Sequence, residues 1–234
     1  MNATPVFMPA TASPTPLPTA TINWFPPTAT PTPGVFATNP PAAEMRPGLG
    51  PLILTDDFSD PSLWDIAVSD EASAAIENNS LILAAQSGVY MLSLRHGDAL
   101  DDFYAEITAR PNICRANDDY GLLVRANTAA YYRFALSCNG TARMDRMSNG
   151  TKLTLQQPLA SGDVPPGAPG EVRIGVWAVG REMRLFLNGR FQFTVIEPGY
   201  PRGTLGVFVN SAGDSPLVVS FSNLVVQNVA YTPP

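Results

Sequence analysis

Apolar and polar residues alternate along most of the chain from residue 52 onward, with the period of two that places strand side chains on opposite faces. Asn-Gly pairs separate several of these runs, and such a pair between alternating runs is a strong hairpin signal. The clearest hairpin is predicted around Asn188-Gly189, and no segment shows a convincing helical period. Strands are predicted at 52–55, 73–77, 81–85, 89–94, 103–109, 120–126, 131–138, 151–156, 172–179, 182–187, 190–196, 204–210 and 217–229.

So many strands without a helix predict an all-β fold, a two-sheet antiparallel jelly-roll sandwich over residues 52–234. Residues 1–51 differ in composition, because they hold 13 of the 24 prolines, many of them beside threonine. Proline fixes φ and removes a backbone donor, so this segment is predicted to be an extended Pro/Thr-rich stalk ahead of the sandwich.

One part of the stalk has the length and alternation of a strand. Residues 19–25 contain no proline, and Ile22 and Trp24 fall on one side of the run, with Phe25 at its end. Such a segment can add to a sheet edge or fill a groove on another copy of the chain. A head-to-tail contact of this kind, if it does not close, builds a filament. The alternative is a set of scattered apolar residues in an extended tail.

Composition and charge exclude several function classes. The net charge is −6, which argues against a general nucleic-acid partner. One histidine and two cysteines are too few for a zinc site of the usual Cys/His kind. No apolar run reaches about 20 residues, so no membrane span is predicted. The first residues do not form a signal peptide, and the stalk composition leads us to expect an export signal upstream and an extracellular or cell-surface location.

The alternation also predicts which side chains face outward. On 131–138 and 172–179 one set, including Phe134 and Ile174, is apolar and belongs between the sheets. The opposite set forms an outer face of arginines, aromatic rings and a carboxylate, groups that bind sugars by stacking and by paired hydrogen bonds. The alternative is an ordinary solvated face with cross-strand pairs. The predicted glycan-binding residues are Arg125, Tyr131, Arg133, Trp177, Phe186 and Glu106.

Several sequence motifs resemble those of the concanavalin A-like lectin/glucanase superfamily, and more narrowly its laminin-G-like and 3-keto-disaccharide-hydrolase-type domains. This resemblance covers residues 52–230 and implies the jelly-roll fold. It leaves three functions open, because the superfamily includes lectins, hydrolases and interaction modules. The motifs are LTDDFSDP at 54–61 followed by Trp64, DYGLLVR at 119–125, YYRF at 131–134, LFLNG at 185–189, GTLGVFV at 203–209 and VSFSNLVV at 219–226.

Catalysis is the first of the activities that the resemblance raises. Retaining glucanases of this superfamily carry carboxylates at alternate positions of one strand, where one attacks and the other donates a proton. The predicted strands offer only separate glutamates, namely Glu106, Glu171 and Glu182. We therefore expect a non-enzyme, and a glycoside hydrolase acting through Glu106 is the alternative.

A structural calcium ion is the one cofactor that the resemblance implies. Asp56, Asp57 and Asp60 offer the hard oxygen ligands that calcium prefers, although Asn223 stands where relatives often have an acid. The alternative is that these acids form turns. No other cofactor is expected.

Cys114 and Cys138 are the only cysteines. An even number in an exported protein favours a disulfide between them, with two free thiols as the alternative. His96 is predicted to be a surface residue.

Two function classes follow from these observations. The first is an extracellular, non-catalytic module that binds glycans or other cell-surface components. The second is a structural subunit that assembles into a filament with copies of itself through residues 19–25.

Overall fold

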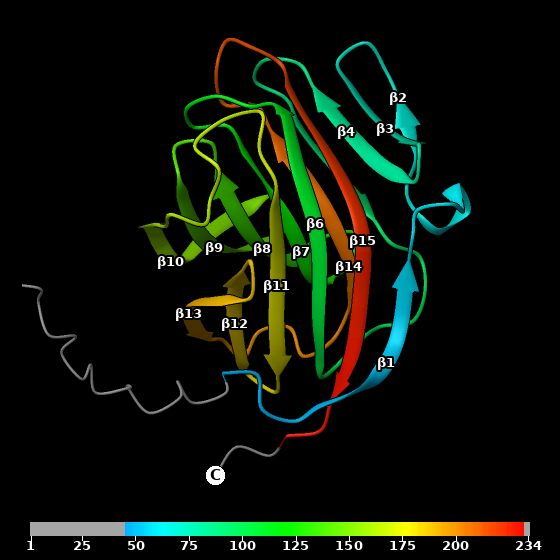
Figure 1. The fold of residues 1–234 in the computed structure, drawn as a ribbon, viewed down its shortest axis with the longest axis vertical. Coiled ribbons are helices and arrows are strands. Elements are labelled where there is room, and N and C mark those ends of the chain that lie inside the picture. Colours follow the sequence, from blue (N-terminus) through cyan, green and yellow to red (C-terminus); the bar gives the residue numbers. More distant parts are fainter. Residues whose placement is uncertain (1–44, 232–234) are drawn as a thin grey trace, which may run out of the picture. The chain divides into compact units, whose positions relative to one another are not determined.

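Fifteen strands and one short 3-10 helix make up residues 45–231, the part of the chain that the computed structural model describes (Figure 1). The strands form two antiparallel sheets. The nine-stranded sheet has the order β13-β12-β11-β6-β15-β4-β3-β2, with β1 also paired to β15, and the six-stranded sheet has the order β10-β9-β8-β7-β14-β5.

The nine-stranded sheet contains β1 (Leu49–Asp56), β2 (Ala67–Val68), β3 (Ala72–Glu77), β4 (Ser80–Ala85), β6 (Phe103–Ile113), β11 (Val172–Val179), β12 (Glu182–Leu187), β13 (Arg190–Ile196) and β15 (Leu217–Val229). The six-stranded sheet contains β5 (Tyr90–Leu94), β7 (Asp119–Ala126), β8 (Ala130–Ser137), β9 (Thr141–Ser148), β10 (Thr151–Ala160) and β14 (Thr204–Asn210). The 3-10 helix is η1 (Pro61–Leu63), and the Asp60 side chain caps it.

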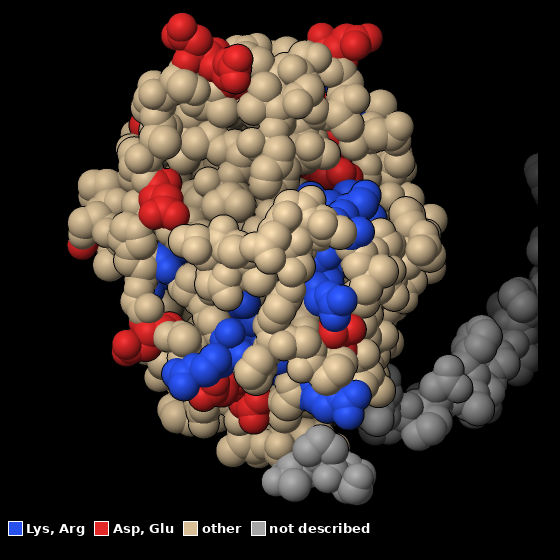
Figure 2. Space-filling view, turned by 180° about the vertical axis from the view of Figure 1, so that it is seen from behind, with Lys and Arg blue, Asp and Glu red and all other residues tan. Residues whose placement is uncertain are grey.

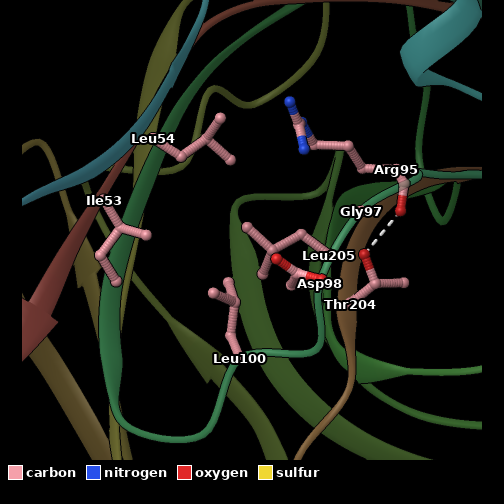
Figure 3. Close-up of a pocket in the computed structure, with 8 residues that line it drawn as sticks. All are labelled: Ile53, Leu54, Arg95, Gly97, Asp98, Leu100, Thr204 and Leu205. Atoms are coloured by element: carbon pink, nitrogen blue, oxygen red, sulfur yellow. Dashed lines mark hydrogen bonds between the residues drawn. The ribbon is translucent and has the colours of Figure 1, made fainter.

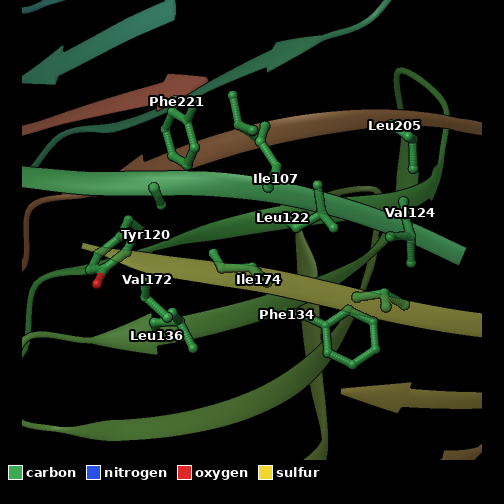
Figure 4. Packing of buried hydrophobic residues seen from close by; sticks show 14 of the residues in the cluster. Ile107, Tyr120, Leu122, Val124, Phe134, Leu136, Val172, Ile174, Leu205 and Phe221 are labelled. Atoms are coloured by element: carbon green, nitrogen blue, oxygen red, sulfur yellow. The ribbon is translucent and has the colours of Figure 1, made fainter. Parts of the chain in front are cut away.

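The hydrophobic core lies between the two sheets, as the alternation predicted (Figure 4). Leu122 and Phe134 enter it from the six-stranded sheet, and Ile107, Ile174 and Phe221 enter it from the nine-stranded sheet. Each of these side chains is fully buried, and full burial of one such side chain contributes about 1.5–3 kcal/mol. In each strand, the residues that alternate with the core residues point outward. The sandwich therefore has two separate outer faces, one on each sheet.

The hairpin predicted around Asn188-Gly189 is confirmed. Leu187 pairs with Arg190, and the two turn residues have φ angles of 52° and 78°. Positive φ at both central residues is the requirement of a type I′ turn, which asparagine and glycine meet at least cost. The strand pair β12–β13 therefore follows directly from the local sequence.

The sequence pattern did not predict two of the strands, β2 and β9. The short β2 has only two residues, and β9 lies between the two turn signals Asn139-Gly140 and Asn149-Gly150. In β9 only Ala142 and Met144 belong to the core cluster, and the charged residues Arg143, Asp145 and Arg146 interrupt the apolar pattern. A strand with so short an apolar stripe has almost no period-two signal.

The first strand begins at Leu49, three residues before the predicted boundary of the sandwich, and pairs with β15. We call residues 45–48 the strap. They lie on the outer face of the nine-stranded sheet: the Trp177 indole N–H donates to the carbonyl of Pro47 at 3.0 Å, and Arg184 donates to that of Met45 at 2.8 Å. The end of the predicted stalk therefore belongs to the sandwich.

Candidate functional site

The structure corrects the prediction that the glycan-binding candidates share one outer face. Trp177, Phe186 and Glu106 lie on strands of the nine-stranded sheet, whereas Tyr131 and Arg133 lie on β8 of the six-stranded sheet. The two outer faces point away from each other, because the core separates the sheets. A period-two pattern tells which side of a strand is polar, and it does not tell to which sheet the strand belongs.

On the nine-stranded sheet, the aromatic candidates are covered. Trp177 is 0% exposed and Phe186 is 2% exposed, so neither ring offers a stacking surface. The guanidinium of Arg46 in the strap lies 5.3 Å from the Phe186 ring centre, and Arg184 lies 4.5 Å from that of Trp177. Tyr231 adds an edge contact to Trp177 from the other end of the chain. This face is a second, smaller packed layer.

Glu106 has a structural setting on the same sheet. Its carboxylate accepts a hydrogen bond from Tyr104 at 2.8 Å and pairs with Arg173 at 3.2 Å. Burial, together with the neighbouring charge of Glu106, raises the pKa of Tyr104 to about 12. The other two glutamates considered for catalysis are also ion-paired, Glu171 with Arg110 and Glu182 with Arg184. Each of these three glutamates is therefore paired with an arginine.

Arg125 holds loops together and does not face a ligand surface. It lies next to the end of β7 with a φ of 50°, and its side chain is 1% exposed. The guanidinium donates to the carbonyl oxygens of Gly180 at 2.7 Å, Tyr200 at 3.2 Å and Asp101 at 3.1 Å. Burial lowers its pKa. These bonds tie three loops at one end of the sandwich.

The outer face of the six-stranded sheet carries a network of two arginines and two aspartates. Arg133 of β8 donates two hydrogen bonds to Asp145 of β9, at 2.6 and 3.1 Å. Arg143 donates to the same carboxylate at 3.2 Å and binds Asp119 of β7 through two hydrogen bonds of 2.6 and 2.7 Å. Thr154 of β10 completes the shell of Asp145 at 2.9 Å. Charged side chains therefore link β7, β8 and β9, and the Thr154 hydroxyl adds β10.

This network is electrostatically fixed. Burial alone would raise the pKa of Asp145, but the hydrogen bonds and charge of Arg133, the charge of Arg143 and the hydrogen bond from Thr154 outweigh it and hold the pKa below its ordinary value. The hydrogen bond and charge of Asp119 likewise raise the pKa of Arg143. A general acid in glycoside hydrolysis needs a raised pKa. The pKa of Asp145 is instead lowered, so this carboxylate stays charged and is suited to positioning the two arginines.

Aromatic rings continue this face beyond the network. Arg133 lies over the rings of Tyr90 and Phe208, with its guanidinium carbon 5.8 and 5.1 Å from their centres. The hydroxyls of Tyr90 and Tyr131 are 3.0 Å apart, and burial raises the pKa of Tyr90. Tyr131 and Arg133 therefore lie together on this face, but they are only 7% and 5% exposed and offer little stacking surface themselves.

A polar hollow of about 390 Å³ opens beside the network, near the turns that precede β7 and β9. Figure 2 shows the molecule from the side opposite Figure 1, and on this side basic and acidic side chains lie next to one another across the middle and lower part of the view. The hollow is lined by Asn117, Asp119, Ser137, Asn139, Thr141, Arg143, Lys152, Thr154, Gln157 and Pro158.

The residues of this hollow were not predicted individually. Asp119 stands in the DYGLLVR motif, which was read for its fold and not for its charge. Thr141 and Arg143 lie on β9, the strand that escaped the sequence reading. The usable signal was the cluster of asparagines and threonines around the predicted hairpins, where turn-forming residues and ligand-binding residues have the same composition.

The predicted calcium ligands separate into different local roles. The buried carboxylate of Asp56 accepts from Phe58, Trp64 and Arg95, at 2.8 to 3.1 Å. Asp57 accepts from the backbone of Ser59, and Asp60 caps η1. Asp56, Asp57 and Asn223 line one hollow, but no group of three His, Cys, Asp or Glu residues that could hold a metal ion is found within residues 45–231.

A third hollow, of about 230 Å³, is mainly apolar and lies between β1 and the loop that follows β5 (Figure 3). Ile53 and Leu54 face it from β1, and Leu100 and Leu205 face it from the opposite wall, with Arg95 and Asp98 near its rim. Ile53 is 50% exposed, so this edge of the sandwich leaves apolar surface open to solvent.

The remaining local predictions have mixed outcomes. The disulfide between Cys114 and Cys138 is confirmed, with their Cα atoms 5.8 Å apart. His96 is at the surface as predicted, but it pairs with Asp65 at 2.8 Å, and this hydrogen bond raises its pKa. Within residues 45–231, no helix has the length and hydrophobicity that a membrane span requires. The docking segment with Ile22, Trp24 and Phe25 lies outside the described residues.

Comparison with known proteins identifies the fold and nothing finer. No protein-family model and no curated protein matches the sequence. Three solved structures resemble the chain at 10–14% identity, which is too low to transfer a function. They are the carbohydrate-binding module CBM66 from Bacillus subtilis (14% identity, TM-score 0.57, 71% of this chain and 96% of that one), a Bacillus licheniformis beta-glucanase (10%, 0.58, 77% and 99%) and a Bacillus subtilis protein of unknown function with a galectin-like fold (11%, 0.56, 79% and 99%).

These likenesses confirm the two-sheet jelly-roll sandwich fold that the sequence predicted. One of the three structures is named as a binding module and another as a hydrolase, so the shared fold is compatible with either role.

Proposed function

We propose that this protein is an extracellular, non-catalytic module that binds glycans on the outer face of its six-stranded sheet. The observation that carries this proposal is the polar hollow beside the Asp119–Arg143 pair. Its amide and hydroxyl side chains match the alternating donors and acceptors of a sugar ring. The arginine–carboxylate network beneath it fixes the floor, so a ligand would meet an already ordered surface.

The non-catalytic part of the proposal rests on the two carboxylates of this face. Asp145 accepts four hydrogen bonds and is fully buried, and Asp119 is bound through both oxygens to Arg143. Hydrolysis of a glycosidic bond needs one carboxyl group that donates a proton and a second that attacks or activates water. Both aspartates here are occupied in holding arginines.

The extracellular part is supported by the disulfide, because such bonds persist mainly in oxidising compartments. Cys114 precedes β7, and Cys138 follows β8, 24 positions later in the sequence. The disulfide therefore crosslinks the ends of the two strands beside the hollow. A protein that binds glycans outside the cell would meet them with a binding face that is covalently braced.

The test is a glycan array probed with the full chain, followed by titration calorimetry with the glycans that bind. Gln157→Ala removes an exposed amide from the hollow, and Gln192→Ala is the matched control on β13 of the other sheet. One lost hydrogen bond of about 0.5–1.5 kcal/mol corresponds to roughly 2- to 12-fold weaker binding for the first variant and no change for the second. Equal effects of the two variants, or cleavage of the bound glycan, would contradict the proposal.

A second candidate function is assembly into a filament, and one observation favours it. The free side of β1 presents Leu52 and Ile53 next to the apolar hollow, which suits addition of an extended segment from another copy. Residues 19–25 of that copy would be the added segment. Deletion of residues 1–33 should then abolish filaments seen by electron microscopy and leave glycan binding intact, and filaments that survive the deletion would refute this role for the stalk.

A further inference from the structure

One charged residue of the polar hollow has no counter-ion. Lys152, the one lysine of the chain, lies on β10, is exposed and lines the hollow. It forms no ion pair with any of residues 45–231. The charges around it are already balanced, because Arg133 and Arg143 face Asp145 and Asp119 in the network.

The charge balance of the lining shows what this residue adds. Among the residues that line the hollow, Asp119, Arg143 and Lys152 are charged. The bidentate pair of Asp119 and Arg143 has no net charge, so the ammonium group of Lys152 gives the hollow a net charge of about +1. The chain as a whole carries −6, so the hollow differs in sign from the rest of the protein.

We propose that the glycan bound in this hollow is acidic, and that Lys152 recognises its anionic group, either a uronate carboxylate or a sulfate ester. This inference rests on the proposed glycan-binding function and specifies its ligand class. A compact ammonium group on a flexible stem suits either anion, because it makes a charge-assisted hydrogen bond without a fixed planar geometry. The neighbouring amides and hydroxyls would bind the hydroxyl groups of the same sugar.

A different role for Lys152 follows from its position on an edge strand. β10 ends the six-stranded sheet, and a lysine on an edge strand opposes pairing with another molecule. That role would make the lysine important for solubility and irrelevant for binding. The two roles differ in measurable ways, because only the first makes the effect of Lys152 depend on the charge of the glycan.

The test compares paired acidic and neutral probes on the full chain. Polygalacturonate is paired with its uncharged methyl ester for the carboxylate arm, and dextran sulfate with uncharged dextran for the sulfate arm. Lys152→Gln removes the charge, Lys152→Arg retains it, and Arg181→Gln is the matched control, an exposed position in the turn between β11 and β12 of the other sheet.

We expect Lys152→Gln to weaken binding of the acidic probe about two- to fivefold at low salt, as for a partly exposed ion pair, and to leave the neutral probe unchanged. Lys152→Arg should bind within about twofold of the parent, Arg181→Gln should match the parent, and the difference should shrink as salt rises. The arm that shows the effect identifies the anion.

Chemical labelling gives an independent readout. An acetylating reagent modifies Lys152 and the N-terminal amine, which peptide mass spectrometry separates. The acidic probe should protect Lys152 and leave the N-terminus reactive. Binding of neutral glycans with no effect of Lys152→Gln and no protection would overturn this inference while leaving the proposed function intact, whereas failure of every glycan to bind would overturn both.

Discussion

The network of Arg133, Arg143, Asp119 and Asp145 on the six-stranded sheet can be broken by a single substitution. Asp145→Asn keeps the size of the side chain and removes its charge. Arg133 would then remain 6% exposed at its side chain without the carboxylate that accepts two of its hydrogen bonds. Breaking one side of a buried ion pair costs about 3–5 kcal/mol, because the remaining charge is left uncompensated. For a domain of this size that is a fall in Tm of roughly 6–20 °C.

The assay is urea unfolding at pH 7, with thermal melting as a second measure. Asp101→Asn is the matched control, because Asp101 pairs with Arg202 at 3.3 Å while both side chains are more than half exposed. An exposed pair contributes about 0–1 kcal/mol, so this control should stay close to the parent. Combining Asp145→Asn with Arg133→Met should cost less than the sum of the single changes, by about 0.5–3 kcal/mol.

The same pair predicts a dependence on pH. Because the folded protein lowers the pKa of Asp145, its contribution is fully present above the ordinary value of 3.8 and is lost as the pH falls through the folded pKa. The gap between the parent and Asp145→Asn should therefore narrow below pH 3.8. A loss below about 1 kcal/mol at pH 7, or strictly additive single changes, would refute the view that this network is a coupled buried unit.

Three further predictions concern other parts of the sandwich. Reducing the disulfide should lower the free energy of unfolding by about 3 kcal/mol, the chain-entropy value for a loop of this length, and an unchanged urea midpoint would contradict this. The hydrogen bond to Asp65 raises the pKa of His96, so the stability from this pair is complete below pH 6.5 and is lost as the pH rises through the folded pKa; NMR titration should show a raised pKa that Asp65→Asn returns toward 6.5. Deleting residues 1–48 should expose Trp177, shift tryptophan emission to longer wavelength and lower the free energy of unfolding by about 1–3 kcal/mol, because two hydrogen bonds are lost. Deleting residues 1–44 is the control and should change neither property. Identical spectra for the two deletions would contradict the covering of Trp177 by the strap.

Most of the fold could be predicted because its signals are local. Alternation identified 13 of the strands, and the Asn-Gly turn at 188–189 specified the β12–β13 hairpin. What the sequence did not supply was sheet membership. The β6 and β8 strands show the same alternation, yet β6 pairs with β15, more than 100 residues later, whereas β8 pairs with its immediate neighbours. Pairing over such distances depends on the packing of the whole chain and not on a local pattern.

The candidate site was harder to predict for a related reason. Trp177 and Phe186 have the composition of a sugar platform, but the strap and Tyr231 cover them, and no local pattern indicates that a chain end will fold back over a sheet. Asp145 and Arg143 carry the charges that hide β9 from a hydrophobicity pattern, and the same charges build the floor of the hollow. The residues that mark the site were therefore the ones that weakened the structural signal.

Hydrogen–deuterium exchange of the full chain, with and without the glycan that binds best on an array, tests most directly whether the six-stranded sheet is the binding face. We predict that the bound glycan slows exchange at residues 117–119, 137–143 and 152–158, around the polar hollow. Slowed exchange confined to β6, β11 and β12, or a protein that binds no glycan at all, would contradict the account.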